Sequence, residues 1–152
     1  IEIGALDGGS AVWFFDMLKA LEIESKVYSY DIDLSRIKFT NHSNVTFLKM
    51  DSNNIEEEFI LPDKIDRPLL IIEDAHVNLR NVLEFLSNIM LKGDYLVVED
   101  TIGLVYDSNE CYQELSRFME GHLDDLLVDS YFTDNYGYNV SWNWNSVFKK
   151  VK

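Results

Sequence analysis

The sequence predicts an α/β fold, with a mostly parallel sheet and helices on both of its faces. Three observations lead to this class. The chain opens with alternating apolar residues that end in a glycine-rich turn, and an apolar run at helical spacing follows at residues 11–21. Segments rich in β-forming residues then alternate with helical segments, which is typical of parallel strands joined by right-handed crossovers. Residues 68–72 are apolar throughout, as in a strand that is buried on both faces.

Length and composition predict one domain. The chain has 152 residues, of which 47% are hydrophobic, enough for a single core. It starts within a predicted strand, so we expect one domain over residues 1–152 whose N-terminal part is missing. The one cysteine, Cys111, excludes an internal disulfide and fits a reducing, cytoplasmic location. No apolar run reaches the roughly 18 residues of a membrane span, so we expect no membrane partner.

The charge of the chain argues against a nucleic-acid partner. It carries 27 acidic and 13 basic residues, for a formal net charge of −14. Such a balance repels a phosphate backbone. Most of the carboxylates are expected to keep the surface solvated, but several follow predicted strands, where ligands bind in this class of fold.

The first turn is the main candidate for a binding element. A dinucleotide turn needs G-x-G-x-x-G, but Leu6 stands two residues after Gly4, and a Walker loop needs Lys where Ser10 stands. The remaining pattern, an acid at Glu2 with glycines at Gly4 and Gly8, resembles the first motif of class I S-adenosylmethionine (SAM) methyltransferases. Glycine permits positive φ and close approach of a ligand, and Ser10 is expected as a helix N-cap beside N–H groups that favour negative charge. The alternative is a turn that binds nothing.

Acidic residues follow the second and third predicted strands. Residues 26–30 alternate and are rich in β-forming residues, so they predict a strand that ends at Asp31. In doubly wound folds an acid about 20 or more residues beyond the glycine turn accepts hydrogen bonds from ribose hydroxyls, and Asp31 has this position. Residues 45–50 predict a third strand that ends at Asp51. In the methyltransferases that the first turn resembles, an acid there commonly receives the adenine amino group.

Three more acids follow the next two strands. The expected elements are a strand at 68–72, a helix at 78–91 and a strand at 95–98. Parallel strands place Asp74, Glu99 and Asp100 at one edge of the sheet, because their carboxyl ends meet there. Hard oxygen ligands of this kind suit Mg²⁺, which keeps waters for a substrate to replace. Alternatively, these acids cap the following helices or face solvent.

Several ordered motifs resemble the family of rhamnosyl O-methyltransferases and cephalosporin hydroxylase-type proteins. They are IEIGALDGGS (1–10), DIDLS (31–35), IIEDAHVN (71–78), VVEDT (97–101) and the closing segment GYNVSWN (137–143). The resemblance implies a Rossmann-like class I methyltransferase fold and a Mg²⁺ site on Asp74, Glu99 and Asp100. The chain departs from the family pattern at Trp144, where we expect Pro, and at Ser146, where we expect Gly. Both departures concern the acceptor side more than the cofactor side.

We therefore expect a SAM-dependent O-methyltransferase acting on a hydroxyl of a small molecule, a sugar or a natural product, with help from Mg²⁺. Glu2 would support the amino-acid end of SAM, Asp31 the ribose and Asp51 the adenine. The metal, held by the three strand-end acids, would orient the hydroxyl and lower its pKa. His76 would take the proton or, alternatively, hold Asp74 in place.

The sequence leaves other functions and residue roles open. A SAM-binding domain without catalysis, serving as a structural or regulatory partner, is the main alternative; a nicotinamide oxidoreductase is disfavoured by the missing dinucleotide pattern. His122 begins an H-x-D pattern that an iron oxygenase would need, but no histidine follows it, so we expect it at a helix end. Tyr138, Trp142 and Trp144 line the acceptor pocket or pack in the core. Association into a homo-oligomer is possible on the family resemblance.

Overall fold

The structure is a computed structural model that describes residues 1–40, 42–62, 65–101, 110–134 and 145–152. It divides into two compact units, Ile1–Asp66 and Arg67–Lys152. The prediction of a single domain stays a prediction.

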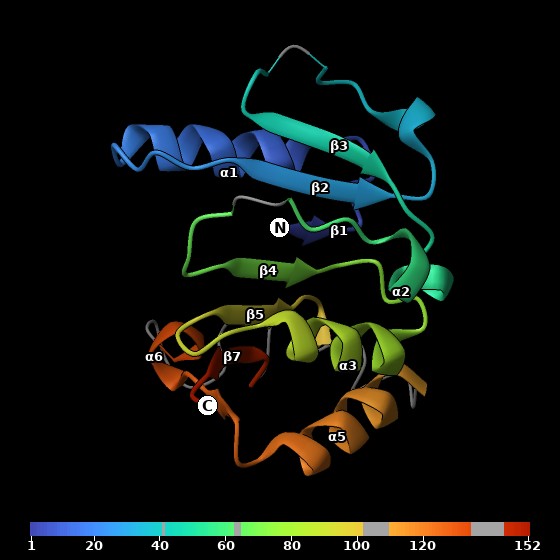
Figure 1. Cartoon of the computed structure of the whole chain (residues 1–152), viewed down its shortest axis with the longest axis vertical. Coiled ribbons are helices and arrows are strands. Elements are labelled where there is room, and N and C mark those ends of the chain that lie inside the picture. The colour runs from blue at the N-terminus through green and yellow to red at the C-terminus, as the bar shows by residue number, and fades with distance from the viewer. Residues whose placement is uncertain (41, 63–64, 102–109, 135–144) are drawn as a thin grey trace. The chain divides into compact units, whose positions relative to one another are not determined.

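The first unit holds three parallel strands with one long helix beside them (Figure 1). Its elements, with η for a 3₁₀ helix, are β1 (Glu2–Ile3), α1 (Gly9–Ala20), β2 (Val27–Asp31), η1 (Leu34–Arg36), β3 (Val45–Lys49), η2 (Ser52–Asn54) and α2 (Ile55–Glu58). The strands are paired in the order β3-β2-β1, so β2 is central within the unit. Ser29 of β2 lies opposite Glu2 of β1.

One face of α1 forms the core of the first unit. Ala11 is fully buried against Val27 of β2 and Val45 of β3. Further apolar side chains pack around this centre: Phe14, Phe15, Leu18 and Phe47. The helical members of the set recur at i, i+3, i+4 and i+7, the spacing that keeps one face of a helix on a sheet.

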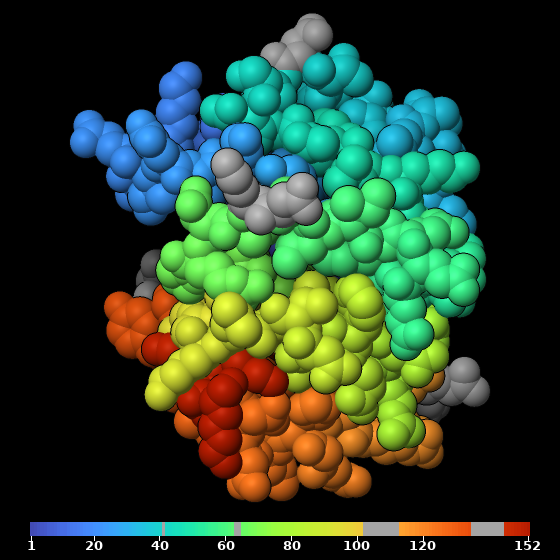
Figure 2. Space-filling view, viewed as in Figure 1, coloured from blue at the N-terminus to red at the C-terminus, as the bar shows by residue number. Residues whose placement is uncertain are grey.

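The second unit begins with two parallel strands and ends with an antiparallel pair. Its elements are β4 (Leu70–Glu73), α3 (Leu79–Ile89), β5 (Tyr95–Val98), α5 (Glu110–His122), β6 (Leu126–Val128), α6 (Ser130–Thr133) and β7 (Val147–Lys150). Strand β7 lies between β5 and β6 and is antiparallel to both. Figure 2 shows the C-terminal residues (red) at the surface between the β5 segment (yellow) and the α5–β6 segment (orange). The prediction of an α/β fold with a mostly parallel sheet is confirmed.

Helix α3 supplies much of the core of the second unit. Four of its residues at helical spacing are 0% exposed: Leu79, Val82, Leu83 and Leu86. Burying each side chain of this size contributes about 1.5–3 kcal/mol relative to leaving it in water. They accompany buried strand residues, among them Ile71 of β4, Leu96 of β5 and Phe148 of β7. Among the described segments, no helix is long and apolar enough to cross a membrane.

Several strand boundaries differ from the prediction by one or two residues, and the end of β4 is the difference that matters for the site. The fifth strand has the predicted bounds, 95–98, but β4 ends at Glu73, one residue later than predicted. Its register aligns Glu73 with Val98 of β5. Glu73 is therefore a buried strand residue and not part of the loop that follows.

Candidate functional site

The glycine turn after β1 has the backbone conformation that its sequence predicts. Gly4 has φ 104° and Gly8 has φ 83°, a region that side chains rarely adopt. A Cβ added to Gly8 would lie 2.8 Å from Cζ of Phe47, so packing requires glycine there as well. The N–H of Gly8 closes the turn by donating to the carbonyl of Ala5 at 2.7 Å.

The prediction that Ser10 caps helix α1 is wrong. Gly8 is the N-cap residue, and it has no side chain that could accept a hydrogen bond from the helix. The helix starts at Gly9 because the left-handed conformation of Gly8 already turns the chain into it, which places Ser10 in the first turn, exposed. Because the N-cap is a glycine, it offers no side-chain acceptor to the first N–H groups of α1. The N–H of Gly9 instead donates to Oδ1 of Asp7, the residue before the cap, at 3.1 Å.

Glu2 and Asp31 connect β1, β2 and the glycine turn. The carboxylate of Glu2 is buried and accepts a hydrogen bond from the hydroxyl of Ser29, its neighbour across the two strands. Asp31 accepts from the N–H of Leu6 at 2.8 Å through Oδ2, and from the N–H of Asp33 at 2.9 Å through Oδ1. Each oxygen of Asp31 retains a further lone pair, so it can also accept from a ligand hydroxyl.

Asp51 has a local structural role. It is the N-cap of η2, and its Oδ1 accepts from the backbone N–H of Asn53 at 2.9 Å. Its own N–H donates to Glu58 at 2.8 Å. Contact with an adenine amino group therefore stays a prediction for this residue.

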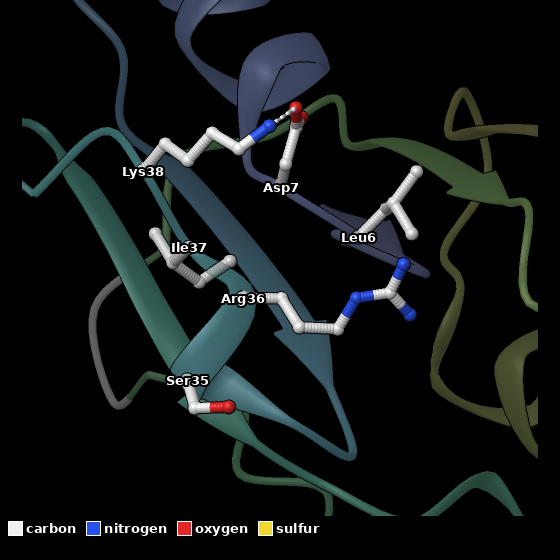
Figure 3. A pocket seen from close by; sticks show the side chains of 6 residues that line it. All are labelled: Leu6, Asp7, Ser35, Arg36, Ile37 and Lys38. Atoms are coloured by element: carbon white, nitrogen blue, oxygen red, sulfur yellow. Dashed lines mark hydrogen bonds and ion pairs between the residues drawn. The ribbon is translucent and has the colours of Figure 1, made fainter.

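A pocket opens beside the glycine turn, which the sequence did not indicate. It has a volume of about 490 Å³ and is lined by Leu6, Asp7, Ser35, Arg36, Ile37 and Lys38. Figure 3 shows Arg36 and Lys38 extending from the segment after β2 toward the turn, where Lys38 pairs with Asp7 at 3.2 Å. The N–H of Gly9, and then Lys38, hold the pKa of the Asp7 carboxyl below its usual value. Small-molecule sites commonly have volumes of roughly 300–1,000 Å³.

In the second unit, the ends of β4 and β5 lie side by side. The register that aligns Glu73 with Val98 brings Asp74 next to Glu99, and the N–H of Glu99 donates to the carbonyl of Glu73 at 3.0 Å. Asp74 and Asp100 are exposed and Glu99 is half-buried. Within the described parts of the chain, however, no three His, Cys, Asp or Glu side chains form a group that could hold a metal ion. The three acids therefore share one edge without converging on a common point.

Glu73, which the sequence did not single out, has a strongly perturbed carboxyl at this edge. The residue is 0% exposed, and its Oε1 accepts from the N–H groups of Ala75 at 3.2 Å and His76 at 2.9 Å. Its Oε2 is buried with no hydrogen-bond partner among the described residues. Burial raises the pKa of Glu73 to about 7, and the charge of Asp74 acts in the same direction, while His76 opposes both. An acid that ends an otherwise apolar strand was the available signal.

His76 joins the two strand ends. Its Nε2 lies 2.9 Å from the carbonyl oxygen of Glu99. Because a carbonyl can only accept, Nε2 carries the proton in this contact, and Nδ1 is the nitrogen that can take one. The backbone of His76 has φ 52°, and that of Asp100 also has φ 52°, a conformation that non-glycine residues adopt at a cost.

Some predicted acceptor-side residues lie outside the described part of the chain, namely Tyr138, Trp142 and Trp144. Ser146, the second departure from the family pattern, is described and fully buried. Its hydroxyl lies 3.2 Å from that of Thr101, and its carbonyl accepts from the N–H of Val98 at 3.0 Å. The serine thus adds a side-chain contact beside the acids that follow β5.

Comparisons with known proteins agree with the sequence motifs. A family model described as Rhamnosyl O-methyltransferase/CmcI matches residues 1–149. No curated protein matches the chain. The Mg–SAM form of CmcI superposes with a TM-score of 0.82 at 28% identity, over 99% of this chain and 63% of that one. Its SAH form gives 0.79 at 28% identity, over 99% and 68%.

A more distant structure shares the fold alone. The fibrillarin/Nop5p complex matches with a TM-score of 0.56 at 17% identity, over 82% of this chain and 60% of that one. The chain thus spans 63% of the length of CmcI in the Mg–SAM form, and the activity of a whole protein does not follow from the match.

Proposed function

Because the chain belongs to the rhamnosyl O-methyltransferase/CmcI family, we propose that it is part of a SAM-dependent O-methyltransferase. Its acceptor would be a hydroxyl of a small molecule, a sugar or a natural product, and Mg²⁺ would assist the transfer. The observation that carries the proposal is the link from Asp31 to the glycine turn, the 2.8 Å hydrogen bond from the N–H of Leu6. This bond unites the two sequence signals of a SAM site in one local structure.

The first unit supplies the residues for the cofactor. Gly4 and Gly8 let the backbone approach it without a Cβ, and Asp31 would accept hydrogen bonds from its ribose hydroxyls. Asp51 would receive the adenine amino group. Glu2 would act mainly by holding β1 to β2, since Oε2 of its carboxylate already binds Ser29. The pocket of about 490 Å³ beside the turn is large enough for a nucleoside.

The second unit supplies the residues for the acceptor and its metal. Asp74, Glu99 and Asp100 would hold Mg²⁺ if their side chains turned toward one point, because their carboxylates are hard oxygen ligands that follow two paired parallel strands. In the conformation described here these acids form no group that could hold a metal ion. Bound SAM would supply an electrophilic methyl group, and bound Mg²⁺ a Lewis acid that lowers the pKa of the acceptor hydroxyl. The protein then mainly has to align the hydroxyl oxygen with the methyl carbon.

His76 would take the proton that the acceptor hydroxyl loses. Its Nε2–H donates to the carbonyl of Glu99, which fixes the orientation of the ring. Imidazole side chains commonly serve as general bases in enzymes. The residue would therefore both join the two strand ends and serve the reaction.

Calorimetric titration tests the proposal. The purified chain is titrated with SAM, with and without Mg²⁺, and with NADH as a control. Binding of SAM but not NADH, followed by methyl transfer from labelled SAM to a panel of sugar and polyketide hydroxyls, would support it. Binding of NADH in place of SAM would overturn it. Binding of SAM without any effect of Mg²⁺ or any turnover would indicate a non-catalytic SAM-binding domain.

A further inference from the structure

The pocket beside the glycine turn has an excess of positive charge, in contrast to the chain as a whole. Three of its six lining residues are charged: Asp7, Arg36 and Lys38. Lys38 and Asp7 pair at 3.2 Å, so their charges compensate each other. The charge of Arg36 is left over, in a chain whose formal net charge is −14. A local cation of this kind favours a ligand that carries an anionic group.

The other side-chain donors that line the pocket are already engaged. The hydroxyl of Ser35 donates to Oδ1 of Asp33 at 2.6 Å, and the ammonium of Lys38 donates to Oδ2 of Asp7 at 3.2 Å. The guanidinium of Arg36 makes no hydrogen bond or ion pair with any residue that the structure describes. Figure 3 shows its side chain extending toward Leu6 and not toward Asp7. Its donors are therefore available to a ligand.

Arginine suits a carboxylate better than lysine does. Its planar fork of N–H groups matches the two oxygens of a carboxylate, and it is more weakly hydrated than an ammonium, so less water has to be removed on binding. The side chain of Arg36 is also exposed, so it has little part in the packing of its unit.

The proposed cofactor has a carboxylate to which no residue is yet assigned. In SAM the ribose is joined to a methionyl group, which ends in an ammonium and a carboxylate. Asp31 is the proposed partner of the ribose. Glu2, the residue expected at the amino-acid end, is buried and accepts a hydrogen bond from Ser29. As an acid, Glu2 could in any case bind only the ammonium.

The proposed ribose site and the pocket adjoin each other at Leu6. The N–H of Leu6 donates to Asp31 at 2.8 Å, and Leu6 also lines the pocket. A ligand whose ribose binds Asp31 therefore has the pocket directly beside it. A phosphate on that ribose would be repelled by the charge of Asp31, whereas a carboxylate at the end of the methionyl chain avoids this repulsion.

We infer that Arg36 binds the carboxylate of the methionyl group of SAM and makes the site selective for ligands with an intact amino-acid end. The inference rests on the proposed function, which places the ribose of SAM at Asp31. It requires no metal ion, and every residue that carries it lies in the first unit.

Decarboxylated SAM tests this contact directly, because it lacks only the carboxylate of SAM. Calorimetry gives the dissociation constants of both compounds for wild type, Arg36→Gln and Arg36→Lys. Wild type should bind SAM about 10- to 100-fold more tightly than decarboxylated SAM, the usual effect of a hydrogen bond between charged groups. Arg36→Gln should bind the two compounds within about threefold of each other. Arg36→Lys keeps the charge without the fork, so its preference should be intermediate.

Arg117 supplies the matched control. It is an exposed arginine of α5, in the other unit, and does not line the pocket. Arg117→Gln removes the same charge from the chain and should keep the wild-type preference for SAM. If Arg117→Gln loses the preference to the same extent as Arg36→Gln, net charge causes the effect and the inference is wrong. Urea unfolding of each variant confirms that the proteins compared are folded.

The remaining outcomes also decide. If Lys38→Gln abolishes the preference and Arg36→Gln keeps it, the carboxylate binds Lys38 and the inference is wrong. If wild type binds SAM but does not prefer it to decarboxylated SAM, or if Arg36→Gln keeps the preference, the inference is overturned and the proposed function stands. If wild type binds neither compound, the cofactor part of the proposed function fails and this inference fails with it.

Discussion

Asp31 holds the glycine turn through Leu6 and is the expected partner of the ribose, and a single substitution removes both roles. Asp31→Ala removes the acceptor of the Leu6 N–H and the expected partner of the ribose. Hydrogen bonds to a charged group contribute about 1.5–3 kcal/mol, so SAM affinity measured by calorimetry should fall about 10- to 100-fold. Asp33→Ala is the control, because the side chain of Asp33 caps the neighbouring η1, where it accepts from the N–H and the hydroxyl of Ser35. Equal effects of both changes would remove Asp31 from the cofactor site.

A comparison of Gly8 and Gly93 separates two reasons why replacing a glycine lowers stability: steric overlap of the new side chain and strain in the backbone. Both have positive φ, but a Cβ on Gly8 meets Phe47 at 2.8 Å, whereas a Cβ on Gly93 meets nothing within 4 Å. Gly93→Ala should cost about 1–2 kcal/mol in the free energy of unfolding, from backbone strain alone. Gly8→Ala should cost about 1–3 kcal/mol more, from overpacking. Urea unfolding measures both, and equal costs would show that the Phe47 ring moves aside freely.

Between elements, Lys150 of β7 joins α3 to the segment that follows α5. Its ammonium lies 3.2 Å from the hydroxyl of Ser87 in α3 and 2.5 Å from Asp125. His122, at the end of α5 as predicted, contacts Glu84 of α3 at 3.0 Å and Asp125 at 3.2 Å. Burial alone would raise the pKa of Asp125, but the contacts with Lys150 and His122 outweigh it and hold this pKa below its ordinary value.

This network predicts a dependence of stability on pH. A carboxyl whose pKa is lowered by folding stabilises the fold above its unfolded pKa, and that contribution is lost as pH falls through the folded value. Lys150→Met should therefore lower the free energy of unfolding by about 1–3 kcal/mol at pH 7, with a smaller difference from wild type in strong acid. Lys149→Met, an exposed neighbour on β7, should change little at either pH. Urea unfolding at pH 7 and pH 3 tests this; a difference that grows toward acid would contradict it.

For the molecule as a whole, the proposed cofactor and metal residues belong to different compact units. Glu2, Gly4, Gly8, Ser10, Asp31 and Asp51 lie in the first, and Asp74, His76, Glu99 and Asp100 in the second. Asp74→Asn or Glu99→Gln should therefore abolish metal-dependent turnover and leave SAM affinity within about threefold, because the two ligands use different acids. Calorimetry with SAM and a methyl-transfer assay measure the two effects. A parallel loss of SAM affinity would show that the division of roles is wrong.

Much of the candidate site was readable from local pattern. The glycines at 4 and 8, and the acids at 31, 74, 99 and 100, follow apolar strands, and the end of each strand is set by hydrophobic periodicity within a few residues. The local pattern misplaced the cap of α1 at Ser10, because a glycine in the left-handed region can start a helix as well as a capping side chain can.

The sequence by itself determined the α/β class, the order of the main strands and helices as far as Val98, and the family, since these depend on the spacing of residues along the chain. Only the tertiary structure decided that Glu73 is buried against its own turn, that Asp31 holds Leu6, and that His122 lies between Glu84 and Asp125. These contacts join residues from different elements or depend on what covers a side chain. Burial and hydrogen-bond partners are properties of packing in space, and periodicity along the chain does not encode them.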